Sequence, residues 1–354
     1  MKFDELTKKI LELADWSSSG RNCTSLSDQP SAYFFIKNVN GAQFILILFA
    51  SVFTFIVLFL AAIHWFYVWM YVAEEKRQNK LYFLLSLFPV SAMCCYIGMI
   101  SPRTSMMMSS LGVLYFLTCL FILISLINHL FGSREAFATI LLLDKKPIDF
   151  QSPPFCCCCS FLPKAKSSKS FNSRRNLRQL EWLVLQAPVV RAMIVTFNVI
   201  AIAEWREAAN KYIHFSETIS VASLLLAIFG VHTLARLTSD KLRRYGFMTI
   251  FRVVDIALLF FTAQQPIIFE NILIRFNVLK CGPLLSTLDN ARLICNFVII
   301  VEMLLLSLFI TFMVAPSRSA LFDLYGSKES NDMQSRLTQE SLLSNRETDV
   351  IVLA

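Results

Sequence analysis

Seven stretches of mainly apolar residues dominate this chain and leave few folds open to it. Each is at least about 20 residues long, the length that a helix needs to cross the hydrocarbon core of a bilayer. The stretches are 44–72, 81–100, 111–131, 183–203, 215–237, 247–269 and 293–314. Every connection between them carries charged residues, Pro or Gly. The pattern predicts an all-α polytopic membrane protein with seven transmembrane helices.

The composition agrees with a membrane protein and argues against a soluble domain. Hydrophobic residues make up 56% of the 354 residues and charged residues only 16%, whereas soluble domains carry about 25% charged residues. The first residues, "MKFDELTKKILELADW", mix acids with bases and contain no apolar core of a secretory signal. The first span is therefore predicted to act as its own insertion signal.

The distribution of Lys and Arg predicts the orientation. These residues are more frequent in the connections at 73–80, 132–182 and 238–246 and in the tail from 315 than in the alternate connections, which places the N-terminus outside and the C-terminus inside. The only N-x-S/T sequon begins at Asn22, on the predicted outer side, and is a candidate glycosylation site. We therefore expect an extracellular segment 1–43, a membrane domain 44–314 with a cytoplasmic Cys/Lys-rich loop 132–182, and a disordered cytoplasmic tail 315–354.

Four adjacent cysteines lie in that loop, within "SPPFCCCCSFLPKAKSSK". They are Cys156, Cys157, Cys158 and Cys159. Disulfides are rare in the reducing cytoplasm, and thiols near basic residues at a membrane surface suit S-palmitoylation. Acyl chains with the nearby lysines would hold the loop against membrane lipids. An unmodified apolar segment is the alternative, and a metal site is disfavoured because the loop has no histidine.

Ionisable residues inside the spans are the candidates for a substrate path, because a charge at bilayer depth is costly. Glu302 lies about halfway along the seventh span, and Arg191 lies roughly 12 Å into the fourth by the helical rise, so the two could form an ion pair. Arg252 and Asp255 are three residues apart on one face of the sixth span, where Arg252 is shallow enough to reach the interface. Asn296 in the seventh span completes the set. Structural ion pairs that fix helix packing explain these charges equally well.

Further polar residues in the spans could line a path or join helices by hydrogen bonds. They include Asn128, His129, Asn198, His232, Gln264 and Gln265. The chain contains none of the motifs H-E-x-x-H, G-x-S-x-G and G-x-x-x-x-G-K-[ST], so we expect neither an enzyme nor a cofactor. The basic loop would face anionic lipids, which argues against a nucleic-acid partner.

Several of these segments together resemble a known family. "LLSLFPVSAMCCYIGMISPRTS", "YFLTCLFILISLINHLFGSREAF", the cysteine run after "PP" and "LQAPVVRAMI" follow one another in the order found in the alpha subunit of the organic solute transporter family. The similarity extends from about residue 80 to residue 316. The short cysteine run and the serine-rich loop are more typical of an invertebrate member than of a vertebrate one.

The resemblance implies facilitative, sodium-independent transport of amphipathic organic anions such as bile acids and steroid conjugates across the plasma membrane. It also implies assembly with a small single-span beta subunit, and a homo-oligomer remains possible. Arg191 would contact the anionic head of the solute, and acyl chains on the cysteine run would form one wall of its groove.

Two other functions are weighed against transport. A seven-helix receptor is disfavoured because the third span ends in "INHLFG" instead of D-R-Y and the seventh lacks N-P-x-x-Y. A protein of membrane traffic or membrane shape, with the acylated loop as its working part, remains open on the sequence alone.

Overall fold

The computed structural model describes residues 29–132, 173–205, 209–239, 245–276, 284–313 and 319–325, together with a few single positions between them. All regular elements in these ranges are helical. They are α2 (Ala32–Lys37), α3 (Gly41–Tyr71), α4 (Glu75–Leu85), α5 (Leu87–Ile100), η2 (Pro102–Thr104), α6 (Ser105–Leu130), α9 (Ser173–Trp205), α10 (Ala209–Thr238), α11 (Phe247–Leu259), η5 (Phe260–Leu273) and α12 (Thr287–Met313).

The prediction of seven spans is confirmed: seven helical stretches of the described chain are long and apolar enough to cross a membrane. Several begin earlier than predicted, because a helix continues into polar turns that hydropathy does not mark. The second stretch starts at Glu75, the third at Pro102 and the seventh at Thr287. Helix α9 starts at Ser173, so residues 173–182, predicted as loop, are helical.

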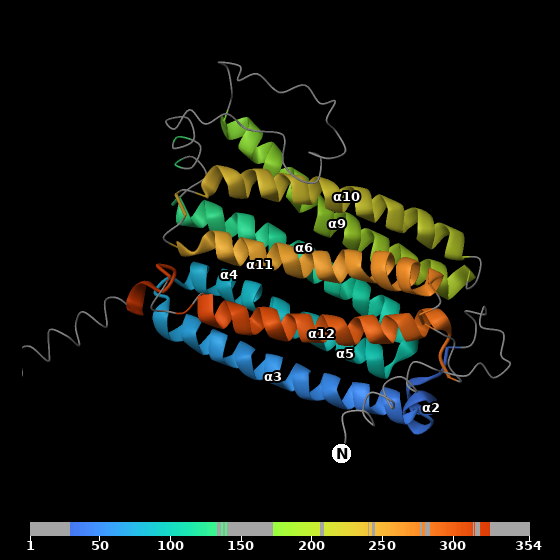
Figure 1. Ribbon diagram of the computed structural model, residues 1–354. Coiled ribbons are helices and arrows are strands. Elements are labelled where there is room, and N and C mark those ends of the chain that lie inside the picture. Colours follow the sequence, from blue (N-terminus) through green and yellow to red (C-terminus); the bar gives the residue numbers. More distant parts are fainter. Residues whose placement is uncertain are drawn as a thin grey trace, which may run out of the picture.

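The helices run alternately up and down in one elongated bundle (Figure 1). Helices α9 and α10 lie side by side along one flank, and α3 lies along the opposite flank (Figure 1). Between them, α6 contacts α5, α4, α9 and α11, while α12 contacts α5, α3 and η5. We call the bundle end where α6 stops and α9 starts the α6–α9 end, and the other the α9–α10 end.

Burial distinguishes the central helices from those that face lipid. Half of the apolar window of α6 is buried, against 22% of that of α3. Large apolar side chains lie on the outside of the bundle, such as Phe55 of α3, which is 71% exposed, and Phe312 of α12, which is 72% exposed. Exposed phenylalanines of this kind fit a chain whose solvent is hydrocarbon.

Two prolines alter the helices locally. Pro89 has no N–H, so the carbonyl of Leu85 loses its helical partner; α4 ends there and α5 begins at Leu87. In the sixth span, α11 continues as the π-helix η5, which contains Pro266. The wider turn relieves the clash that a proline ring makes in an α-helix, and Asn271 Nδ2 donates to the Pro266 carbonyl at 2.6 Å. The hydropathy pattern predicts a helical span at 247–269 but does not indicate the change to a π-helix.

Residues 319–325, which belong to the predicted tail, pack on the α6–α9 end. Leu321 and Phe322 are buried, and the Tyr325 ring meets that of Tyr71 edge-on with centroids 5.2 Å apart. Asp323 accepts hydrogen bonds from the Arg77 side chain and the Ala73 backbone N–H. This segment therefore closes over the turn between α3 and α4.

Candidate functional site

A stripe of polar residues on α10 faces α9 across the hairpin that these helices form. Ser216, Ser220 and Ser223 recur at intervals of four and three residues and are all buried, the spacing of one helix face. Ser216 Oγ donates to Asn198 Oδ1 of α9 at 2.8 Å. We call the group Ser110, Arg191, Asn198, Ser216, Glu217 and Ser220 the polar seam.

Arg191 is the centre of this seam. Its Nη1 donates to Glu217 Oε2 at 2.7 Å and to Ser220 Oγ at 2.8 Å. Its Nη2 donates to Ser110 Oγ of α6 at 3.2 Å. Arg191 is only 7% exposed, and it lies about 27 Å from the start of α9 by the helical rise. One guanidinium thus joins three helices near the middle of the fourth span.

The charge of Arg191 is only partly satisfied. Its buried Nε has no hydrogen-bond partner among the described residues, although a guanidinium can donate five hydrogen bonds. Its counter-ion Glu217 has a side chain that is 35% exposed, against 8% for Arg191. An exchange of Glu217 for another anion would leave the Ser110 and Ser220 contacts in place. The guanidinium and the two serine hydroxyls are therefore groups that can bind an oxyanion.

The predicted pairing of Arg191 with Glu302 is wrong. Arg191 pairs with Glu217 instead, and Glu302 accepts a hydrogen bond from Gln264. Both predicted partners do lie near mid-span, but α9 packs on α10 and α6, whereas α12 packs on α5, α3 and η5. Equal depth on two helices does not make them neighbours.

Glu302 and Gln264 form a second buried polar contact, between α12 and η5. Gln264 Nε2 donates to Glu302 Oε1 at 3.0 Å. The remaining oxygens, Gln264 Oε1 and Glu302 Oε2, are buried and have no partner in the described part of the chain. The contact holds the π-helix against the seventh span without satisfying either side chain fully.

Asn296, another predicted site residue, joins α12 to the start of α6. Its Nδ2 donates to Ser105 Oγ at 3.3 Å. A Cβ atom on Gly98 of α5 would lie 2.9 Å from the same Nδ2. The tight three-helix packing gives Asn296 a structural role.

Arg252 and Asp255 do not act as a pair. Arg252 is exposed, and it makes no ion pair within the described ranges. Asp255 Oδ2 lies 3.3 Å from His232 Nε2 of α10. In the described chain, the hydrogen bonds and ion pairs of Arg191, Asp255, Asn296 and Glu302 go to residues outside the predicted set.

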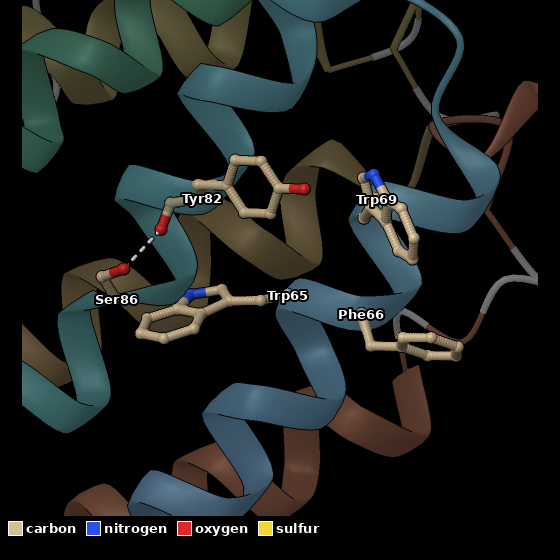
Figure 2. A pocket seen from close by; sticks show the side chains of 5 residues that line it. All are labelled: Trp65, Phe66, Trp69, Tyr82 and Ser86. Carbon is tan, nitrogen blue, oxygen red and sulfur yellow. Dashed lines mark hydrogen bonds between the residues drawn. The ribbon is translucent and has the colours of Figure 1, made fainter.

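A recess lies on the opposite flank, at the α6–α9 end of α3. It has a volume of about 510 Å³ and is lined by Trp65, Phe66, Trp69, Tyr82 and Ser86. Figure 2 shows the Tyr82 hydroxyl pointing toward Trp69, and Ser86 Oγ donates to the Tyr82 carbonyl oxygen at 2.7 Å. The recess is lined by residues of α3 and the C-terminal part of α4, and α3 lies on the flank opposite α9 and α10 (Figure 1), so the recess is separate from the polar seam.

Sequence reasoning missed four members of the seam: Ser110, Ser216, Glu217 and Ser220. Glu217 lies only two residues inside the predicted fifth span, 215–237, close to its polar boundary. The helical spacing of Ser216, Ser220 and Ser223 was the available signal. The candidate modification sites, Asn22 and the four cysteines from Cys156 to Cys159, lie outside the described residues.

Comparisons with known proteins support a transporter. A model of the family described as organic solute transporter Ostalpha matches residues 46–318. Organic solute transporter alpha-like protein 3 of Caenorhabditis elegans is 54% identical over 304 residues, which cover 86% of each chain. No solved structure shows significant similarity.

Two further relatives from Caenorhabditis elegans are more distant. Organic solute transporter alpha-like protein 1 is 30% identical over 76% of this chain and 68% of its own length. Organic solute transporter alpha-like protein 2 is 26% identical over 89% of this chain and 93% of its own length. With its seven spans and a family match over most of its length, the chain belongs to the organic solute transporter Ostalpha family.

Proposed function

We propose that this protein carries amphipathic organic anions, such as steroid conjugates and bile-acid-like solutes, across the plasma membrane by facilitated transport. The observation that carries the proposal is Arg191, a buried cation near mid-span whose Nε has no partner in the described chain. A charge at this depth is expensive and by default functional. An anionic head group is the ligand that it suits.

The surroundings of Arg191 fit a solute with a polar head and an apolar body. Ser110 and Ser220 already accept hydrogen bonds from the guanidinium, and their hydroxyl groups can donate to an oxyanion. Val189, Met193 and Phe197 of α9 are each more than half exposed on the outside of the bundle. Such an apolar row offers a surface for a steroid body at the lipid boundary.

The test is uptake of a labelled steroid sulfate into cells that express this chain. Removing Arg191 alone would leave the carboxylate of Glu217, whose side chain is 35% exposed, without its partner and would destabilise the protein. The informative variant is therefore the double change Arg191→Gln and Glu217→Gln, which keeps the hydrogen-bonding groups and removes both charges. We expect its uptake to fall at least tenfold, roughly the effect of 1.4 kcal/mol, at equal surface amount.

Arg252→Gln is the matched control, because Arg252 is an exposed arginine of another span, the sixth. It should transport at the wild-type rate. Equal uptake by the double variant and the wild type would overturn the assignment of Arg191.

We further propose that the chain works as the alpha subunit of a heteromer with a small single-span beta subunit. The support is membership of the Ostalpha family. Uptake should be strong only when the chain is co-expressed with such a subunit. Full uptake by the chain alone would reject this part of the proposal.

The cysteine run from Cys156 to Cys159 is proposed as an acylated anchor of its loop. Adjacent thiols beside Lys164 and Lys166 suit palmitoylation at an anionic membrane surface. Replacement of all four cysteines by serine should abolish hydroxylamine-sensitive labelling and reduce surface delivery or uptake. Replacement of Cys94, which lies inside α5, is the control and should leave the labelling unchanged.

A further inference from the structure

His232 and Asp255 meet between α10 and α11. His232 Nε2 lies 3.3 Å from Asp255 Oδ2. The other ring nitrogen, Nδ1, lies 3.0 Å from the Ile228 carbonyl oxygen. The imidazole also stands edge-on to the Phe251 ring, with centroids 5.2 Å apart. Three contacts thus fix the orientation of the imidazole.

These contacts determine which atoms of His232 and Asp255 must carry a proton. A carbonyl oxygen can only accept, so Nδ1 carries a proton and donates it to Ile228. In a neutral imidazole, Nε2 then presents a lone pair to the carboxylate of Asp255. Two acceptors at 3.3 Å repel each other in a medium of low dielectric constant. The contact is favourable only when one further proton lies on Nε2 or on the carboxyl group.

The His232–Asp255 pair links two parts of the helix bundle. Asp255 is about 12 Å from the start of α11 by the helical rise, and it is near the α6–α9 end. Helix α10 packs mainly on α9, whereas α11 packs on η5, α12 and α6. The His232–Asp255 contact therefore links the α9–α10 hairpin to a helix on which the hairpin otherwise packs little.

Other charged groups on the packed helices have different positions or partners. Arg252 of α11 is exposed, and Arg236 lies one turn beyond His232 on α10. Glu181 of α9 accepts from Asn128 of α6 at 2.8 Å, and His129 of α6 lies 2.8 Å from Glu74. Glu302 of α12 is bonded to Gln264 of η5. The contacts of Glu181 with Asn128, of His129 with Glu74 and of Glu302 with Gln264 are thus distinct from the His232–Asp255 contact.

We propose that His232 and Asp255 form a proton-dependent latch that holds the α9–α10 hairpin against α11. Loss of the shared proton to water leaves a carboxylate opposite a lone pair, and the hairpin separates from α11. Because Arg191 joins the hairpin to Ser110 of α6, this movement reaches the polar seam. Transport therefore rises as the pH rises, an inference that rests on the proposed function.

The experiment compares steroid sulfate uptake by the wild type, Asp255→Asn and Asp255→Ala between about pH 5 and 8, where imidazoles titrate. A sulfate ester stays anionic throughout, so the charge of the solute is constant. The amide of Asp255→Asn donates to Nε2 without an extra proton, so this variant should be slow and independent of pH. Asp255→Ala has no latch and should be fast and independent of pH.

We expect the wild type to gain at least about fivefold in uptake over this range, the lower end of usual coupling. His129→Asn removes another histidine–carboxylate contact and should keep the wild-type slope. A wild-type slope in Asp255→Asn would overturn the latch, as would loss of the slope in His129→Asn alone.

Thermal melting of the purified protein separates failure of the latch from failure of the proposed function. The latch stabilises only while the proton is bound, so the melting temperature of the wild type should fall as the pH rises, and that of Asp255→Asn should fall less. Absence of uptake at every pH with this melting difference intact would reject the proposed function alone. Equal pH dependence of melting in both proteins would reject the latch.

Discussion

Gly112 of α6 lies directly against the ring of Phe261 in η5. A Cβ atom on Gly112 would overlap the Phe261 Cζ and Cε1 atoms. The ring cannot move freely, because Phe261 is buried and its centroid is 5.2 Å from that of Phe116. The absence of a side chain at position 112 therefore sets how closely the π-helix approaches the central helix.

Gly112→Ala should destabilise the protein. Alanine favours a helix over glycine by about 1 kcal/mol, but overpacking a tight interior costs about 1–3 kcal/mol. The steric cost should dominate and lower the melting temperature in detergent. Adding Phe261→Leu, which shortens the opposing side chain, should restore most of the loss.

Gly41→Ala is the matched control, because nothing lies within 4 Å of a Cβ atom built at that position. It should melt at the wild-type temperature or slightly above it. A Gly112→Ala protein that melts like this control would show that α6 and η5 are packed more loosely than the structure indicates.

Glu302→Gln should stabilise the bundle. Glu302 Oε2 and Gln264 Oε1 are both buried acceptors without partners in the described chain. An amide at position 302 can still accept from Gln264 Nε2 and can also donate to Gln264 Oε1. We expect a gain of about 1 kcal/mol, the usual net value of one hydrogen bond, seen as a higher melting temperature. Glu302→Leu, which removes both possibilities, should melt lower than the wild type.

Asp323→Ala should release the segment 319–325 from the α6–α9 end. The change removes the acceptor of Arg77 and of the Ala73 N–H. Because Asp323 is 39% exposed, the loss should be modest, about 1 kcal/mol or less. Hydrogen exchange of the backbone amides of Leu321 and Phe322 should become faster, whereas exchange in α12 should not change.

Asn22→Gln should remove a glycan if the N-terminal segment is outside, as the distribution of Lys and Arg predicts. The measurement is the shift in electrophoretic mobility after glycosidase treatment, which the variant should lack. Thr24→Ser, which keeps the sequon, is the control and should retain the shift. A wild-type protein without any glycan, together with an epitope at residue 160 that is accessible from outside, would contradict the predicted orientation.

The sequence alone determined the class of fold and the family. Seven apolar stretches of spanning length leave little choice in a bilayer, because backbone groups in hydrocarbon must be bonded within each helix. The residues around Pro89, the cysteine run and the segment at Arg191 carried the family resemblance. Sequence also identified Arg191, Asp255, Asn296 and Glu302 as polar residues at depth.

Only the tertiary structure decided which of these residues meet. Hydropathy and helical rise give the depth of a side chain but not its neighbours, which depend on how the helices are arranged around the bundle. Hence Arg191 pairs with Glu217 across a hairpin, and Glu302 accepts a hydrogen bond from Gln264 of the π-helix. Asp255 contacts His232 of α10. The π-helix at Pro266 could not be predicted from the sequence either, because its wider turn depends on the packing of η5 against α12 and α6.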